Sequence, residues 1–262
     1  MADNFVNNLS LINQGDGAPA LIFLHYFSGA AASWQWVTEK LKQDFQCIAL
    51  DLPGFGNAPA LDKPTLRNYS SFVYDALACL GIERFVLIGH SMGGKIALQV
   101  AADNCPGLEQ VILVAPSPVT QEPMPQKERE RLLQGPESLE TAQNTVKGAI
   151  QKPLSQIRRA IAVRTHQQAE DKTWRWWLLQ GMDHSIAEQM AQVKVPITVL
   201  ASTDDPVIPL ETIQHEVMEL LPTGDLVKVT GVGHLMPLED PDMVTQVIRA
   251  TVSKEPQGNC KG

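Results

Sequence analysis

Short apolar runs along the chain alternate with longer segments in which apolar residues recur every three or four positions. The run at 20–24 is continuously apolar, which is typical of a strand covered by helices on both sides. The segment 68–80 places its apolar residues on one helical face, and Gly81 is a suitable end for that helix. Further strands are expected at 47–50, 85–88, 111–114, 197–200 and 225–229. This alternation predicts an α/β fold with a mostly parallel sheet and helices on both faces.

One segment interrupts this alternation. Residues 116–191 contain no clear strand pattern; they open with a proline-rich loop and continue as several short helical patterns. We interpret the segment as a helical lid inserted into a single domain that spans residues 1–262. The region before the first strand is short, which allows the sheet to lack an outer strand.

Composition and charge exclude several classes of partner. The formal net charge of -8 argues against binding to nucleic acid or to an anionic membrane, because both rely on clustered Lys and Arg. No apolar run approaches the roughly 20 residues of a membrane-spanning helix, and residues 1–8 lack the features of a signal peptide. We therefore expect a soluble, cytoplasmic protein. The four cysteines form no CxxC pair, and we expect no metal and no cofactor.

The most informative segment is 85–98, in which Gly89-His90-Ser91-Met92-Gly93 stands between an apolar strand pattern and a helical pattern. A serine on such a sharp strand-to-helix turn exposes its hydroxyl above the sheet, and the two glycines remove side chains that would collide there. The same spacing also occurs in glycine-rich connections that serve packing alone. The strand and helix around it favour a nucleophile at Ser91.

A nucleophilic serine needs a base and an acid, which follow it in the order acid, then His, when the turn has this form. Of six histidines, His234 is the best candidate base, because it lies in a glycine-rich loop after the last expected strand. Asp204 and Asp205 both follow the strand expected at 197–200. Either could simply cap a turn. We prefer Asp205 because Pro206 makes the following turn rigid, and Asp204 stays open as the alternative.

With these residues in place, the sequence resembles the α/β-hydrolase superfamily, in its esterase- and lipase-like branch with a small lid. The likeness runs from about residue 10 to 250 outside the lid, and it is carried by the segments 24–27, 51–56, 89–94, 205–209, 233–234 and 239–241. It implies the α/β-hydrolase fold and a catalytic triad of Ser91, Asp205 and His234. It also implies an oxyanion hole formed by the backbone N–H groups of Phe27 and Met92.

Two residues are candidates for contact with the substrate. Tyr26 stands where the superfamily usually has Gly, so it either shapes the mouth of the pocket or serves ordinary packing. Trp177 belongs to a group of three tryptophans within residues 174–177; it either lines an apolar pocket over Ser91 or anchors the lid. Both interpretations of each residue stay open.

The nucleophile narrows the chemistry within this resemblance. Dehalogenases and epoxide hydrolases of this fold use Asp at the position of Ser91. The leading hypothesis is therefore cleavage of a small or medium apolar carboxylic ester, a small-molecule partner, through an acyl-enzyme on Ser91. A cofactor-free haloperoxidase or perhydrolase, or a carbon–carbon bond hydrolase, would use the same triad. A non-catalytic ligand receptor of the same fold is the alternative from another class.

Overall fold

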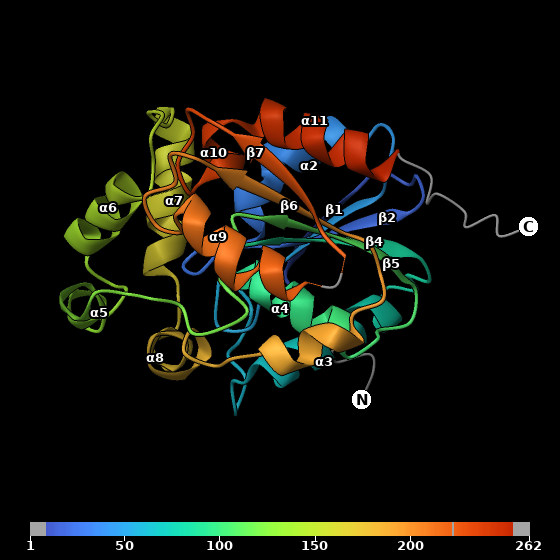
Figure 1. Ribbon diagram of the computed structural model, residues 1–262. Coiled ribbons are helices and arrows are strands. Elements are labelled where there is room, and N and C mark those ends of the chain that lie inside the picture. The colour runs from blue at the N-terminus through green and yellow to red at the C-terminus, as the bar shows by residue number, and fades with distance from the viewer. Residues whose placement is uncertain (1–8, 222, 254–262) are drawn as a thin grey trace, which may run out of the picture.

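A seven-stranded sheet forms the centre of the molecule (Figure 1), in a computed structural model that describes residues 9–221 and 223–253. The spatial order of the strands is β1-β3-β2-β4-β5-β6-β7. The strands are β1 (Leu11–Gln14), β2 (Ala20–Leu24), β3 (Cys47–Leu50), β4 (Phe85–His90), β5 (Leu108–Val114), β6 (Ile197–Ser202) and β7 (Asp225–Val229). Residues 1–8, on which the expectation about a signal peptide rests, lie outside the described part.

All six expected strands are present, and they pair in parallel. A seventh strand, β1, which the apolar runs do not predict, pairs antiparallel with β3. This strand lies at the edge of the sheet and is only partly buried. Its sequence, Leu-Ile-Asn-Gln, therefore carries no continuous apolar run of the kind that marks the covered strands.

Helices cover both faces of the sheet, and strand β2 shows how the sequence provides for this. Leu21 and Phe23 point to the face covered by α2 and α11, whereas Ile22 and Leu24 point to the face covered by α3 and α4. All four side chains are fully buried. The helices named here are α2 (Gln35–Leu41), α3 (Leu66–Cys79), α4 (Met92–Ala102) and α11 (Pro241–Val252). The other helical elements outside the predicted lid are α9 (Leu210–Glu216) and the short η1 (Ala31–Trp34), η4 (Met218–Leu220) and α10 (Met236–Glu239).

The helix expected at 68–80 is confirmed as α3, which begins two residues earlier. Thr65 caps it, because its side-chain oxygen accepts a hydrogen bond from the backbone N–H of Asn68. Beyond its end, Gly81 has a φ of +68°, a left-handed conformation that glycine adopts without strain.

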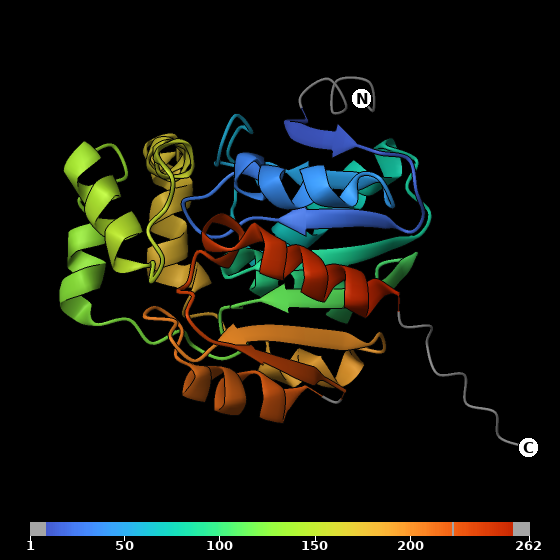
Figure 2. The same ribbon diagram turned by 90° about the horizontal axis from the view of Figure 1, so that it is seen from above.

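Residues 116–191, the predicted lid, lie between β5 and β6 and contain no strand. In Figure 2 the helices α5 to α7 stand at the end of the sheet toward which the parallel strands point. Side chains that follow these strands therefore face this segment. Its elements are α5 (Gln126–Leu132), α6 (Leu139–Gly148), α7 (Gln156–Gln167), α8 (Asp171–Trp176), the π-helical turn η2 (Trp177–Gly181) and the start of η3 (Ala187–Gln192). None of the helices in the described ranges has the length and apolar character that crossing a membrane requires.

Candidate active site

Ser91 lies between β4 and α4 in a strained conformation, with φ +52° and ψ -116°. A non-glycine residue reaches this region only where the surrounding structure holds it. The neighbouring glycines are required by close contacts. A Cβ atom on Gly89 would lie 2.4 Å from the carbonyl oxygen of Gly93, and one on Gly93 would lie 2.6 Å from the carbonyl oxygens of Leu24 and His25. The elbow therefore packs directly against the end of β2.

His234 and Asp205 are brought together from two loops that follow β6 and β7. The Nδ1–H of His234 donates to Oδ2 of Asp205 at 2.8 Å, and both residues are buried. The other oxygen of Asp205 accepts hydrogen bonds from the backbone N–H groups of Val207 and Ile208 at 2.8 and 2.9 Å. With Nδ1 engaged, the Nε2 atom of His234 is left as the nitrogen able to accept a proton.

The residue before the elbow serine brings the histidine loop to it. Nε2 of His90 donates to the carbonyl oxygen of His234 at 2.8 Å, and the two imidazole rings lie 5.2 Å apart. The backbone N–H of His234 donates in turn to the carbonyl oxygen of Ala149 at 2.8 Å. The loop of His234 is thus held between the nucleophile elbow and residues of the predicted lid.

Electrostatic surroundings favour a protonated state of His234. Burial alone lowers the pKa of His234, but the charge of Asp205 and its hydrogen bond raise it, with smaller contributions from Glu122 and Glu239. The pKa is raised overall, so a proton received by His234 is stabilised. The neighbouring His90 has a pKa well below its usual value, because it is buried and faces His234.

Asp204, the alternative acid, has different partners. Its carboxylate accepts hydrogen bonds from the backbone N–H of Gly231 at 2.7 Å and from the hydroxyl of Thr230 at 2.8 Å. These bonds lower the pKa of Asp204. The carboxylate thus closes the turn between two loops instead of facing His234, and this geometry fits a structural role.

Phe27 lies in the turn after β2, and Met92 begins α4 directly after Ser91. Within the described residues, neither backbone N–H has a hydrogen-bond acceptor. His25 fixes the turn, because its Nε2 accepts from the N–H of Leu52 at 3.0 Å and its Nδ1 donates to the carbonyl oxygen of Tyr26 at 2.8 Å. Free backbone donors stabilise an oxyanion when they lie beside a nucleophile, which makes these two N–H groups the candidates for that role.

Trp174 and Trp177 form an aromatic wall that packs against Phe27 in this turn. The ring of Phe27 lies 4.3 Å from the ring of Trp174 and 6.2 Å from that of Trp177, and both tryptophans are buried. Trp176 points elsewhere and stacks on Tyr69 at 5.0 Å. Trp177 therefore packs against Phe27, whose backbone N–H is a candidate donor of the oxyanion hole.

Tyr26 is buried among side chains of the predicted lid and of α10. It packs in one apolar cluster with residues of α6 and α7, and its ring lies 5.1 Å from that of His90. Burial raises the pKa of Tyr26 to about 12. The chain accommodates this large side chain, where the superfamily usually has Gly, by packing the ring beneath α6 and α7.

Glu239 is a functional candidate that the sequence patterns do not reveal. Its Oε2 accepts hydrogen bonds from the backbone N–H groups of Gly233, Gln151 and Lys152, at 2.9, 2.8 and 2.8 Å. One carboxylate thus joins the histidine loop to the linker between α6 and α7. Its place in a Glu-Asp-Pro motif is visible in the sequence, but its partners are not.

Together, the order of the sheet, the strained serine after β4 and the His–Asp pair define an α/β hydrolase. The chain belongs to the alpha/beta hydrolase family, whose model matches residues 21–247.

The chain is similar to individual proteins in sequence and in structure. The chain is 34% identical over 114 residues to 2-succinyl-6-hydroxy-2,4-cyclohexadiene-1-carboxylate synthase of Escherichia fergusonii, a match that covers 44% of this chain and 45% of the relative. A thermophilic esterase from Thermogutta terrifontis superposes with a TM-score of 0.79 at 22% identity, over 93% of this chain and 92% of the other. A bromoperoxidase from Bacillus anthracis gives a TM-score of 0.84 at 16% identity, over 94% and 95%. The chain spans less than half the length of the curated relatives it matches, and the structural matches show the fold alone.

Proposed function

We propose that the protein hydrolyses carboxylic esters through an acyl-enzyme on Ser91. The observation that carries the proposal is the buried 2.8 Å hydrogen bond between His234 and Asp205, held next to the strained elbow by the contact between His90 and the His234 backbone. A hydroxyl at such an elbow becomes a nucleophile when an oriented imidazole removes its proton.

The chemistry follows from these positions. Nε2 of His234 takes the proton of Ser91 as the serine oxygen attacks the ester carbonyl, and then returns it to the departing alcohol. A water molecule, activated by the same imidazole, cleaves the acyl-enzyme and releases the acid. The Asp205 carboxylate fixes the imidazole and stabilises its charged form in both steps.

Charge that develops on the carbonyl oxygen requires donors close to it. The backbone N–H groups of Phe27 and Met92 are the donors we propose for this oxyanion hole. They come from the ends of neighbouring strands and, among the described residues, have no acceptor of their own. The first turn of α4 adds the positive end of its helix dipole.

The aromatic wall over Phe27 supports an ester of small or medium size whose main part is apolar. We propose that Trp177 contacts the substrate there, and that residues 116–191 act as the lid of the pocket. Tyr26 contributes by shaping the floor beneath the lid helices, because its ring is covered by them.

The test is a comparison of wild-type protein with Ser91→Ala on p-nitrophenyl acetate and butyrate. Turnover by the wild type and its loss in the variant, by at least about 10³-fold, is the expected result. Assays of peroxide-dependent bromide oxidation in acetate buffer and of carbon–carbon bond cleavage run in parallel. Activity confined to either of them would replace ester hydrolysis by that reaction.

A further inference from the structure

Glu122 is a buried carboxyl group outside the triad. The residue is only 6% exposed, and its Oε2 has no hydrogen-bond partner in the part of the chain that the structure describes. Ser117 places a buried hydroxyl close enough to Glu122 to lower the pKa of the carboxyl group. Buried polar atoms are normally paired, so a ligand group that completes the Oε2 of Glu122 would bind with a gain in free energy.

Hydrogen bonds connect the loop of Glu122 to the segment that carries Ser91. The backbone N–H of Ser117 donates to the carbonyl oxygen of Ser91 at 3.1 Å. Lys95, on the helix that starts at the elbow, donates through Nζ to the carbonyl oxygens of Thr120 at 2.8 Å and Met182 at 3.2 Å. Glu122 itself donates its N–H to that same Met182 oxygen at 2.8 Å. Its loop is therefore fixed with respect to Ser91.

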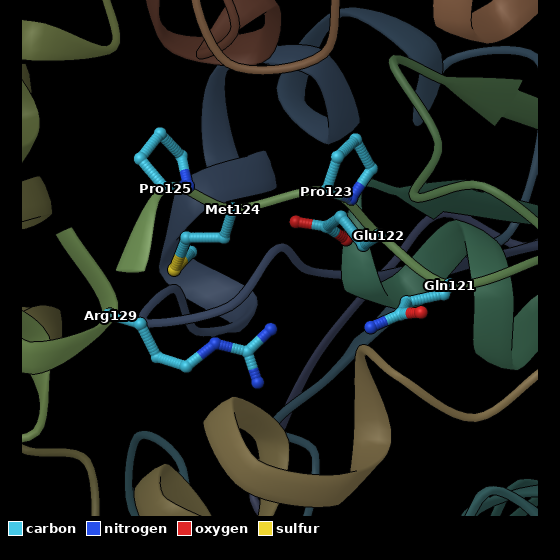
Figure 3. A pocket seen from close by; sticks show the side chains of 6 residues that line it. All are labelled: Gln121, Glu122, Pro123, Met124, Pro125 and Arg129. Carbon is cyan, nitrogen blue, oxygen red and sulfur yellow. The ribbon is translucent and has the colours of Figure 1, made fainter. Parts of the chain in front are cut away.

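A pocket of about 530 Å³ opens beside this carboxyl group. Figure 3 shows the carboxyl of Glu122 and the guanidinium of Arg129 projecting into the same space. The guanidinium of Arg129 already forms a bidentate ion pair with the carboxylate of Asp183, with N–O distances of 2.7 and 2.8 Å. Glu122 is thus the charged side chain of this pocket with an oxygen free to bind. The pocket is lined by Gln121, Glu122, Pro123, Met124, Pro125 and Arg129.

The charges around Glu122 favour an uncharged ligand group. Burial raises the pKa of Glu122, while Ser117, Lys95, His234 and Arg129 oppose the rise. Cationic groups would face Lys95 and Arg129, and anionic groups would face Glu122 itself. A hydroxyl fits either protonation state, because it donates to a carboxylate and accepts from a carboxylic acid.

We propose that Glu122, assisted by Ser117, forms a specificity-determining subsite for a hydroxyl group of the ester substrate. Pro123 and Met124 supply apolar contact beside it. The inference rests on the ester hydrolysis proposed above, and it predicts that hydroxylated esters are preferred over plain ones.

The experiment measures kcat/KM for matched ester pairs with the full chain. Methyl 3-hydroxybutyrate against methyl butyrate tests a hydroxyl in the acyl part, and 2-hydroxyethyl butyrate against propyl butyrate tests one in the alcohol. We expect the wild type to prefer the hydroxylated ester about tenfold or more in one pair, as a hydrogen bond to a buried carboxyl provides. Glu122→Met brings this ratio close to one, and Glu122→Gln retains part of it.

Glu130→Gln is the matched control, because it removes the same charge from an exposed position of α5 and should leave the ratio unchanged. A ratio near one in both wild-type pairs overturns the subsite, as does a ratio that survives in Glu122→Met and Glu122→Gln alike. If the wild type hydrolyses both plain esters in those cases, the proposed ester hydrolysis stands and only the subsite fails. Absence of turnover on every ester, p-nitrophenyl acetate included, overturns both.

Discussion

Two adjacent aspartates follow β6, and their hydrogen bonds separate their roles. Asp205 turns inward to His234, whereas Asp204 turns to Gly231 and Thr230. Pro206 stands directly after Asp205, and the next two backbone N–H groups bind its carboxylate. The rigid turn that the proline favours is therefore the one that aims this carboxylate at the histidine.

Substitution of each aspartate by asparagine tests this division. In Asp205→Asn the amide no longer holds His234 in the required tautomer, and we expect kcat to fall by roughly 10⁴-fold. In Asp204→Asn the loss should stay within about tenfold, because the affected turn lies outside the pair. Steady-state kinetics on p-nitrophenyl butyrate measures both. An equal loss of kcat in the two variants, or a larger loss in Asp204→Asn, would contradict Asp205 as the acid and favour Asp204.

The raised pKa of His234 predicts the pH dependence of the reaction. The base must be neutral, so kcat/KM should rise with pH as His234 loses its proton, with a midpoint above the ordinary value of 6.5. Because Asp205 raises the pKa most strongly, Asp205→Asn should move the midpoint of its residual activity to lower pH. A pH–rate profile of both proteins is the measurement. A wild-type midpoint at or below 6.5 would contradict this electrostatic account.

At the scale of elements, the elbow depends on close packing between α4 and β2. The contact occurs at Gly93, where the helix approaches the carbonyl oxygens at the end of β2. Met92 directly precedes Gly93, and the turn of Phe27 directly follows β2. Stability and the proposed oxyanion hole therefore depend on one contact between two elements.

Gly93→Ala is expected to damage both properties. The new Cβ would lie 2.6 Å from two backbone oxygens, so the elements must separate, at a cost of about 1–3 kcal/mol in the free energy of unfolding. Ester turnover should fall as the two donors move apart. Gly148→Ala is a suitable control, because a Cβ atom at that position would meet nothing within 4 Å. Unchanged stability and kinetics in Gly93→Ala would show that the contact is not needed.

The elements and the triad candidates were predictable because their signals are local. Six strands came from apolar runs, and Ser91 came from glycines within two residues of it. Edge strand β1 was missed, since an exposed edge needs no continuous apolar run. Glu239 was missed for another reason: it binds the N–H of Gln151, 88 residues away, and an acceptor for distant backbone groups leaves no pattern in the sequence. Glu122 was missed because its burial arises only from tertiary packing.

At the scale of the whole molecule, one carboxylate connects three regions around the candidate site. Glu239 belongs to α10, and it binds the histidine loop at Gly233 and the predicted lid at Gln151 and Lys152. His234 adds its own bond to Ala149. The predicted lid and the loop of His234 are thus held in one arrangement.

Glu239→Ala should weaken stability and catalysis together. It leaves three backbone N–H groups without their acceptor, of which that of Gly233 is buried whereas those of Gln151 and Lys152 are only part-buried. We therefore expect the free energy of unfolding to fall by about 1–3 kcal/mol, with a lower kcat. Asp242→Ala, which breaks an exposed ion pair with Lys40, should change stability by less than about 0.5 kcal/mol. Denaturant unfolding of both variants measures the change in the free energy of unfolding. Equally small changes in Glu239→Ala and Asp242→Ala would show that Glu239 does not hold the histidine loop and the predicted lid together.

Active-site labelling tests the activation of Ser91 most directly. The protein is treated with a fluorophosphonate and digested, and the modified peptide is identified by mass spectrometry. We expect a single adduct on Ser91 that forms rapidly in the wild type and at least about 10³-fold more slowly in His234→Ala. Labelling of another residue, or labelling of Ser91 at the same rate without His234, would contradict it.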